Sequence, residues 1–252
     1  MTKKLIAFDL DDTLAVTKSP ISDRMGKLLV ELLNNYDVCI ISGGSLELFQ
    51  MQVIDRLEAT PLQLSRLHLM PTCGTRYYRY EKISEEWALQ YAEDLTKKEK
   101  DKISHALEKA AKSLGIWDIK VYGERIEDRN SQVTYSVLGQ LAPAEKKYEW
   151  AAKNQETKLR LREIVAKELL DLEVRLGGTT SVDVTRIGVD KAYGMQKLIE
   201  ALDISKDEIL FIGDKLQEGG NDYPVKTMGI DSIEVEKWED TAFVLDGITS
   251  IS

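Results

Sequence analysis

Short apolar runs alternate with amphipathic segments along the early part of the chain. Residues 4–9 form one such run, which ends in a carboxylate, and residues 37–41 and 67–70 form two more. Apolar runs of this length are typical of strands that are buried on both faces of a sheet. Between them, residues 22–34 and 45–57 carry apolar side chains at helical spacing. Because strands that alternate with helices form parallel sheets, the pattern predicts an α/β fold with a Rossmann-like parallel core.

The middle of the chain has a different pattern. Two long, highly charged segments show helical spacing, at residues 97–114 and 156–170. Short stretches rich in β-formers predict strands of an antiparallel type, at residues 119–122, 132–138, 173–176 and 181–185. Helices and antiparallel strands that follow one another in this way form an α+β block, so we interpret it as an inserted second domain.

The first pattern returns after this block, with a helix and two strands at residues 192–202, 208–212 and 228–235. We therefore predict a core domain formed by residues 1–83 and 188–252. A cap domain at residues 84–187 interrupts it. The chain crosses between the two domains twice, which predicts hinges near residues 80–86 and 186–190.

Composition excludes several classes of protein. The 252 residues carry a net charge of -9, and an acidic surface repels a polyanion, so we expect no nucleic-acid partner. No apolar stretch reaches the roughly 18 residues that cross a membrane. The first residues enter a strand pattern without the apolar run of a signal peptide, so we expect a cytoplasmic protein without a membrane partner. Two cysteines and two histidines disfavour a disulfide scaffold, a zinc site and a Ser-His-Asp enzyme.

Four polar segments lie at the ends of predicted strands or at the start of a helix. Asp9 opens the segment DLDDT directly after the first strand, and Ser42 opens SGG after the second. Lys191 stands just before a helix, and Asp214 follows the 208–212 strand. In an open parallel sheet the carboxyl ends of the strands form the edge where ligands bind. The order of these segments predicts one site at that edge.

The residue types indicate phosphoryl transfer. A carboxylate such as Asp9 can attack phosphorus and form an acyl phosphate, which divides one difficult displacement into two easier ones. Asp11 lies two residues later, where a carboxyl group can protonate the leaving oxygen and later deprotonate the incoming one. Ser42, the backbone N–H of Gly43 and Lys191 supply donors for the phosphate oxygens.

Carboxylates that face a phosphate require a cation, and Mg²⁺ prefers hard oxygen ligands. We therefore expect Mg²⁺ as the cofactor, held by Asp9, the backbone carbonyl of Asp11 and Asp214. Glu218 and Asp222 follow in the segment EGGND, where they would hold metal-bound waters or orient Lys191.

These segments together resemble the four motifs of the haloacid dehalogenase (HAD) superfamily: FDLDDTLA, IISGG, DK at 190–191 and FIGDKLQEGGND. The position of the cap is similar to that of the subclass with a large α/β cap. Within this subclass the chain resembles the eukaryotic-type phosphomannomutases, through Arg129-Asn130 and through SVDV at residues 181–184. The resemblance implies a distal substrate site in the cap, with Arg129 on a phosphate and with Ser181 and Asp183 on sugar hydroxyl groups.

The chain departs from that family at several positions. Gln140 stands where the family has a cap arginine, Lys147 aligns near a second arginine, and Lys18 replaces the arginine after the first motif. By their positions in the resemblance, Lys18 and Gln140 are expected to bind the substrate. Cys73-Gly74 replaces an Asn-Gly pair, and Asp12 replaces the glycine of DxDGT. Because bidentate arginines grip phosphate most strongly, these replacements favour a phosphatase acting on a small sugar phosphate, with a phosphomannomutase as the alternative.

Other interpretations are weaker. A binding module on an inactive scaffold would not need both Asp9 and Asp11, and a flavodoxin-like receiver would not need a cap. Arg129 could instead form an ion pair with Glu127 or Asp128. The expected partner is a small phosphorylated metabolite, and a homodimer through the cap is an option that the sequence leaves open.

Overall fold

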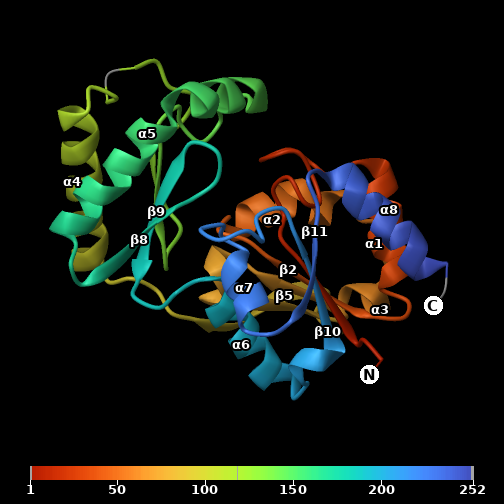
Figure 1. Ribbon diagram of the computed structural model, residues 1–252. Helices are drawn as coiled ribbons and strands as arrows, with labels where there is room; N and C mark the ends of the chain where they lie inside the picture. Colours follow the sequence, from red (N-terminus) through yellow and green to blue (C-terminus); the bar gives the residue numbers. More distant parts are fainter. Residues whose placement is uncertain (1, 118, 251–252) are drawn as a thin grey trace. The chain divides into compact units, whose positions relative to one another are not determined.

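The computed structural model describes residues 2–117 and 119–250, and the chain divides into two units (Figure 1). Unit 1 contains the chain up to Ala92 and from Asp190 onward, and unit 2 is Glu93–Val189. The first crossing therefore lies later than the predicted boundary at residue 83. The reason is an antiparallel hairpin of β4 (Arg76–Glu81) and β5 (Glu86–Ala92), which extends the sheet of unit 1. The first predicted hinge, residues 80–86, includes the turn of this hairpin.

A seven-stranded sheet, in the order β11-β10-β1-β2-β3-β4-β5, forms the centre of unit 1. Its first five members are parallel: β11 (Asp231–Glu234), β10 (Ile209–Gly213), β1 (Leu5–Phe8), β2 (Asp37–Ile41) and β3 (Leu67–Met70). The sequence analysis predicted strands at all five places. The parallel, Rossmann-like core is thus confirmed, and the antiparallel hairpin at its edge is an addition to the prediction.

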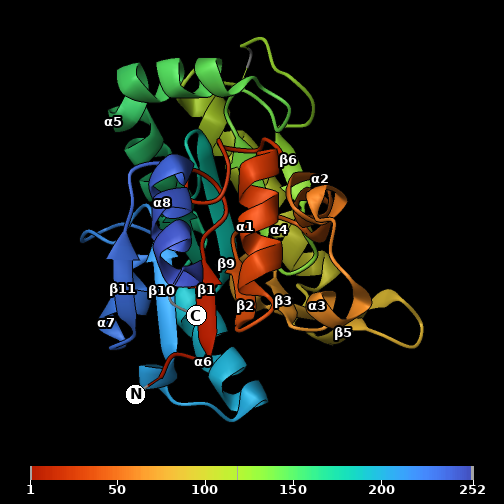
Figure 2. The same ribbon diagram turned by 90° about the vertical axis from the view of Figure 1, so that its right-hand side faces the viewer.

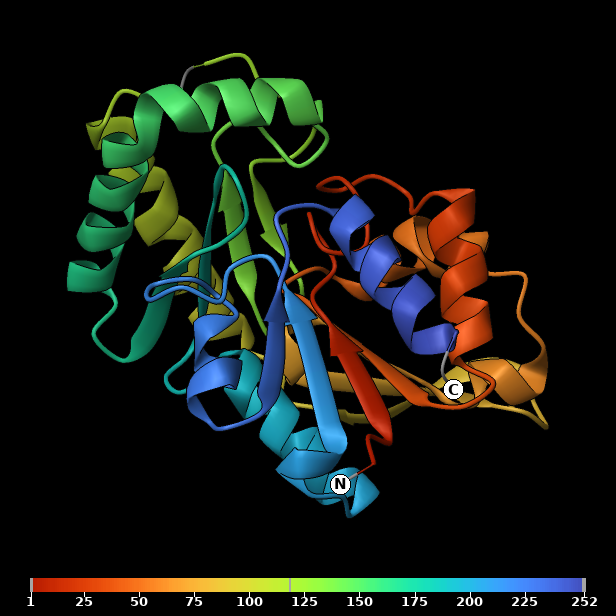
Figure 3. The same cartoon turned by 45° about the vertical axis from the view of Figure 1, so that its right-hand side comes forward.

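The central strands are buried because both faces of the sheet are covered. Ile6 and Phe8 of β1 point to one face and Leu5 and Ala7 to the other, and all four are at most 1% exposed. Two helices, α1 (Asp23–Leu32) and α8 (Trp238–Thr249), lie side by side over the first face (Figure 2). On the second face lie α6 (Lys191–Leu202) and α7 (Tyr223–Thr227), as Figure 3 shows.

Local side-chain contacts define where several helices begin. The Ser22 hydroxyl accepts a hydrogen bond from the Met25 N–H at 3.2 Å, which caps α1. Asp190 caps α6 in the same way through the Tyr193 N–H at 2.9 Å. The helix predicted over residues 45–57 is instead divided into α2 (Leu46–Gln52) and a short 3₁₀ helix, Ile54–Arg56, and α3 (Pro61–Leu64) follows.

Unit 2 is a four-stranded antiparallel sheet in the order β6-β7-β9-β8. Its strands are β6 (Ile126–Asp128), β7 (Val133–Ser136), β9 (Ser181–Arg186) and β8 (Leu172–Leu176). One face carries Tyr135, Val182, Val184 and their apolar neighbours, which pack against α4 (Lys97–Ser113) and α5 (Ala144–Glu168). The other face is polar because side chains alternate along each strand.

Unit 2 corrects the sequence analysis in three places. Residues 119–122 form no strand: Tyr122 instead donates its N–H to Leu138 O at 2.8 Å and accepts from the Leu141 N–H at 2.9 Å within a loop. Strand β6 was not predicted. Helix α5 begins at Ala144 rather than at the predicted residue 156. Its backbone is non-helical at Asn154.

Among the residues that the structure describes, no helix is both long enough and apolar enough to span a membrane.

One of the core strands carries a buried histidine. His68 on β3 is 1% exposed, and its Nδ1 lies 2.8 Å from the Tyr77 hydroxyl oxygen. Burial lowers the pKa of His68 to about 4; the nearby Asp37 carboxylate opposes this shift and Arg79 adds to it. His68 is therefore neutral in the folded protein, in line with the structural role that its apolar surroundings in the sequence predict.

We predict that His68 makes the stability depend on pH between about 4 and 6.5. The unfolded chain binds a proton at a higher pH than the folded chain, so this contribution is complete above pH 6.5 and is lost as the pH falls toward 4. A fall of the His68 pKa from 6.5 to about 4 corresponds to about 3 kcal/mol of stability. Thermal unfolding of His68→Gln should depend less on pH in this window than that of the wild type.

The exposed His105 on α4 supplies a matched control, because His105→Gln should preserve the pH dependence of the wild type. Equal pH profiles for His68→Gln and the wild type would contradict the prediction.

Candidate active site

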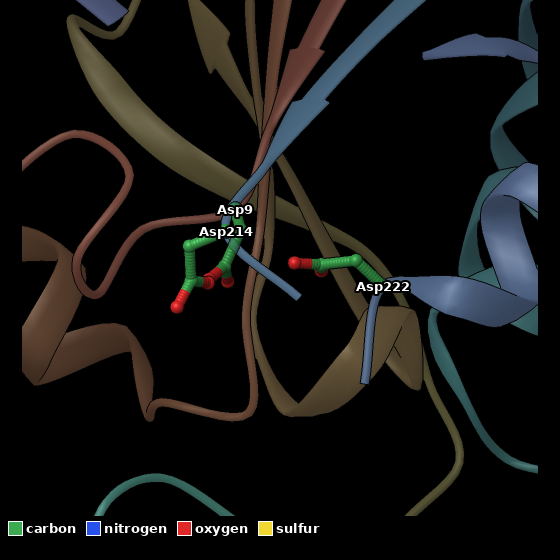
Figure 4. Close-up of side chains that lie close together, drawn as sticks. All are labelled: Asp9, Asp214 and Asp222. Atoms are coloured by element: carbon green, nitrogen blue, oxygen red, sulfur yellow. The ribbon is translucent and has the colours of Figure 1, made fainter. Parts of the chain in front are cut away.

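Three carboxylates meet at the carboxyl edge of the parallel sheet. Asp9 directly follows β1 and Asp214 directly follows β10, and these strands are parallel neighbours that pair Phe8 with Ile212. Asp222 stands at the start of α7. One oxygen from each of the three lies within 4.8 Å of the others. Figure 4 shows Asp222 pointing toward Asp9 and Asp214 from the opposite side of the site.

Lys191 joins two of these carboxylates. Its ammonium Nζ lies 2.5 Å from Asp9 Oδ1 and 2.5 Å from Asp222 Oδ1, and its side chain is 1% exposed. Burial alone would lower the pKa of Lys191, but the Asp222 and Asp9 carboxylates outweigh burial and raise it. Lys191 is therefore a fixed positive charge beside Asp9. Three chain segments that are distant in sequence meet at this group.

A second lysine accompanies Asp214. Lys215 forms an ion pair with Asp214 Oδ2 through its ammonium group, and its backbone N–H donates to Asp222 Oδ2 at 3.0 Å. Gly213 permits this arrangement, because a Cβ there would lie 2.6 Å from Asp222 Oδ2. Both oxygens of Asp222 thus have partners. These contacts fit the predicted role of orienting Lys191, and the predicted role toward metal-bound waters stays a prediction.

The site can hold a cation. Asp214 Oδ1 is buried and receives no hydrogen bond from any described residue. Burial raises the pKa of Asp9 to about 6, since the Asp214 carboxylate adds to the effect of burial and Lys191 only partly offsets it. Three carboxylates against two ammonium groups leave negative charge in a buried place. A divalent cation with oxygen ligands fits this donor set.

The loop after Asp9 fixes the position of Asp11. Asp11 Oδ1 accepts a hydrogen bond from the Lys18 N–H at 2.7 Å, and Asp12 Oδ1 accepts from the Thr17 N–H at 3.1 Å. Asp12 and Lys18 both have positive φ, at 67° and 53°. The loop therefore closes on itself and holds the Asp11 carboxyl group in place. The predicted role of the Lys18 side chain on substrate stays a prediction.

The Ser42–Gly44 loop is attached to the turn after β3. Ser42 is 6% exposed; its carbonyl oxygen accepts from the Cys73 N–H at 2.9 Å, and the Gly44 carbonyl accepts from the Thr72 N–H at 3.0 Å. Thr72 and Cys73 have φ of 51° and 56°, which is uncommon for residues other than glycine. This conformation holds the loop that contains Ser42 and Gly43 at the edge of the sheet.

A close backbone contact positions the helix that carries Lys191. A Cβ on Gly194 of α6 would lie 2.6 Å from the carbonyl oxygen of Cys73 and 2.6 Å from Ile41 Cδ1. A Cβ on Gly74 would lie 2.4 Å from the Cα of Gly194. The absence of both side chains lets α6 approach the turn after β3, and Lys191 begins this helix.

The predicted metal residues are not all at one place. Asp9 and Asp214 lie together with Asp222, whereas Glu218 is exposed and is not part of this three-carboxylate group. The carboxylate of Asp11 is also outside the group, although its predicted ligand is the backbone carbonyl. The roles of Glu218 and Asp11 toward a metal therefore stay predictions.

The predicted substrate residues of unit 2 lie on or beside the polar face of its sheet. Arg129 Nη2 lies 2.6 Å from Glu127 Oε2 and 3.4 Å from Gln140 Oε1, so the ion pair that the sequence allowed is present. Lys147 donates to the Gln140 carbonyl oxygen at 3.2 Å. On β9, Asp183 Oδ1 accepts from the Thr134 hydroxyl at 2.8 Å, and Ser181 pairs across the sheet with Ser136.

Three residues of unit 1 were not found from the sequence. Lys215 directly follows Asp214, and this position after a strand was the available signal. Gln52 is 1% exposed and lies three positions after the buried Phe49, so a polar residue within a buried helical stripe was the signal there. Gly194 gave no signal, because its contact with the turn after β3 depends on tertiary packing.

Similar solved structures place the fold in a known class. The chain aligns with an N-terminally truncated IMP-nucleotidase of Plasmodium falciparum at a TM-score of 0.73 and 17% identity, over 100% of this chain and 71% of that one. A haloacid dehalogenase-like hydrolase from Bacteroides thetaiotaomicron aligns at a TM-score of 0.60 and 15% identity, over 98% of this chain and 100% of that one. The fold is that of the HAD superfamily.

The sequence comparisons identify the family. The family described as eukaryotic phosphomannomutase matches residues 25–249. The phosphomannomutase of Saccharomyces cerevisiae is 28% identical over 233 residues, which are 88% of this chain and 84% of the yeast protein. The chain belongs to the eukaryotic phosphomannomutase family and is an enzyme of the HAD superfamily. The resemblance seen in the sequence is thereby confirmed.

We predict that Gly194→Ala destabilises the protein. The new methyl group must displace α6 from the turn after β3, and overpacking of this kind costs about 1–3 kcal/mol. The matched control is Gly247→Ala on α8, where a Cβ meets no atom within 4 Å and helix propensity favours alanine. Denaturant unfolding should show a lower midpoint for Gly194→Ala and an unchanged or higher one for Gly247→Ala. Equal midpoints for the two variants would show that α6 does not depend on this contact.

Proposed function

We propose that this protein is a phosphomannomutase that interconverts mannose 1-phosphate and mannose 6-phosphate through a phosphoryl group on Asp9. The sequence analysis placed a phosphatase first and the mutase second. Membership of the family and the names of its relatives favour the mutase. The observation that supports the chemistry is the buried Asp9 carboxylate, with Lys191 on one side and Asp214 nearby.

In the first step a carboxylate oxygen of Asp9 attacks phosphorus, and the bond from phosphorus to the sugar oxygen breaks. The electron pair of that bond passes to the sugar oxygen, which takes a proton from the Asp11 carboxyl group. The Ser42 hydroxyl, the Gly43 N–H and the Lys191 ammonium bind the phosphate oxygens. In the second step Asp11 removes a proton from the acceptor hydroxyl as that oxygen attacks phosphorus, and Asp9 is released as a carboxylate.

The donor set fits Mg²⁺. Asp9 and Asp214 would hold it together with the backbone carbonyl of Asp11, and the buried Asp214 Oδ1 has no hydrogen-bond donor among the described residues to compete for it. When bound, Mg²⁺ supplies positive charge that offsets the phosphate and the carboxylates during transfer.

Unit 2 contains the candidate groups for the far end of the substrate. We propose that Arg129 and Lys147 bind the second phosphate of a hexose bisphosphate, and that Ser181 and Asp183 bind sugar hydroxyl groups. Arg129 is 5% exposed and Lys147 is 3% exposed, so neither side chain is freely mobile. A preorganised cation loses less entropy when it binds a phosphate.

One observation supports the phosphatase as a second candidate. Arg129 is paired with Glu127, and the next position in the cluster is the neutral Gln140. Lys147 also contacts Gln140, through the backbone carbonyl oxygen of that residue. An arginine that is already paired with a carboxylate grips a second phosphate less strongly, which would let water reach phospho-Asp9 before the sugar does.

We predict that Asp9→Asn abolishes turnover while the fold survives. The amide keeps the shape of the side chain but cannot attack phosphorus, so the rate should fall by several orders of magnitude. Release of product from a sugar phosphate and trapping of the aspartyl phosphate measure this. The exposed Asp101→Asn on α4 is the control and should behave as wild type. An Asp9→Asn enzyme that retains a tenth of wild-type activity would refute the assignment of Asp9 as the nucleophile.

We also predict that the wild type loses turnover in excess chelator and regains it when Mg²⁺ is added.

We predict that the sugar hydroxyl, rather than water, is the preferred acceptor. Mannose 1-phosphate is supplied with Mg²⁺ and a hexose 1,6-bisphosphate, and mannose 6-phosphate and free phosphate are followed together. Mannose 6-phosphate should form faster than free phosphate. The opposite order would establish the phosphatase and reject the mutase.

Gln140→Arg extends the same experiment. A new charge-assisted pair with phosphate contributes about 1.5–3 kcal/mol, so the ratio of mannose 6-phosphate to free phosphate should rise about tenfold or more. Gln90→Arg on the exposed β5 controls for a general effect of charge. An unchanged ratio in Gln140→Arg would mean that other residues select the acceptor.

A further inference from the structure

Gln52 lies at the end of α2 and contacts the loop that carries Asp11. Its Nε2 donates to Asp11 Oδ1 at 3.0 Å and to the Ser19 carbonyl oxygen at 3.1 Å. The backbone carbonyl oxygen of Gln52 accepts from the Ile21 N–H at 2.8 Å. The side chain is 1% exposed. Because both neighbours of the amide are acceptors, its nitrogen must face them, which settles the orientation of the amide group.

The contact defines which oxygen of Asp11 carries the proton. Asp11 Oδ1 already accepts from the Lys18 N–H at 2.7 Å, and Gln52 adds a second donor. A carboxyl oxygen with two donors directed at it has no free lone pair for a proton. Oδ2 is then the oxygen that remains available to exchange a proton. Rotation of the carboxyl group would break both hydrogen bonds.

We infer that Gln52 is a positioning residue for the acid–base step: it fixes Asp11 Oδ1 so that Oδ2 exchanges the proton with the substrate oxygens. The inference rests on the proposed function, because Asp11 is the acid and base of that mechanism. Gln52 does not touch the reacting atoms. It acts by limiting the orientations of the Asp11 carboxyl group, and a side chain displaced by about 1 Å can reduce a rate substantially.

An alternative role is purely structural. Gln52 also attaches residues 19–21 to α2, so its loss could loosen the whole loop. The two roles differ in their dependence on the leaving group. Departure of a sugar oxygen requires a proton from Asp11, whereas p-nitrophenolate is stable enough to leave without one. A loosened loop would impair both reactions equally.

The test is Gln52→Met, which retains the length of the side chain and removes the donor. Phosphorylation of Asp9 is followed in single turnovers with a hexose 1,6-bisphosphate and with p-nitrophenyl phosphate. We expect the single-turnover rate with the bisphosphate to fall about tenfold to hundredfold, within the range of general acid catalysis. The bisphosphate concentration that gives half of the maximal rate should change little. The rate with p-nitrophenyl phosphate should change by less than about threefold.

Two further variants frame the result. Gln50→Met lies on the exposed side of the same helix and should match the wild type with both donors. Asp11→Asn should show the same selectivity as Gln52→Met, with a larger loss for the bisphosphate. Gln52→Glu is a second variant that serves if Gln52→Met folds poorly. It retains the shape of the side chain but directs an acceptor at Asp11 Oδ1, so it should show the same selectivity.

Each other outcome rejects the inference. Equal losses with both donors in Gln52→Met and Gln52→Glu would assign Gln52 a structural role only, and unchanged rates would remove it from the mechanism. If the wild type forms aspartyl phosphate at Asp9 and Gln52→Met matches it, only this inference fails. If the wild type forms no aspartyl phosphate from either donor, the proposed function fails and the inference falls with it.

Discussion

The buried ammonium of Lys191, between Asp9 and Asp222, is the interaction on which the site depends. It joins the end of β1, the start of α6 and the loop after β10 through two contacts of 2.5 Å. Removing one partner of a buried ion pair leaves an uncompensated charge, which costs about 3–5 kcal/mol. The ion pairs of Lys191 therefore constrain the positions of these three segments as well as the charge of the site. The close contact of Gly74 with Gly194 acts in the same direction, because it fixes α6 against the turn after β3.

Much of the fold follows from local patterns in the sequence. The five parallel strands are short apolar runs buried on both faces, and such runs are recognisable without tertiary information. The hairpin of β4 and β5 was missed because its residues alternate weakly and carry many charges, and this moved the predicted domain boundary into its turn. The strand predicted at residues 119–122 does not form, because the backbone groups of Tyr122 bond to Leu138 and Leu141 within a loop.

The site was predictable where position in the sequence determines position in space. Asp9 and Asp214 each follow a strand of the predicted parallel sheet, so their place at one edge of that sheet follows from the prediction, and the structure adds that the two strands are neighbours. Gln52 and Gly194 act through contacts with segments that are distant in sequence, and no local pattern encodes such a contact. The pairing of Arg129 with Glu127 was available as an alternative, but only the structure shows that it forms.

The number of carboxylates around the buried basic side chains differs between the two units, and this difference bears on the choice of acceptor. Lys191 lies among three carboxylates in unit 1, and that excess of negative charge favours a divalent cation, which would then attract phosphate. In unit 2 Arg129 is paired with Glu127, both Arg129 and Lys147 contact Gln140, and the described residues include no group of three carboxylates able to hold a metal ion. The phosphate affinity that we propose for unit 2 would therefore come from these two cations and their hydrogen bonds. Gln140 lies beside Arg129, so this is the position where we expect an added positive charge to bear most on whether a sugar or water receives the phosphoryl group.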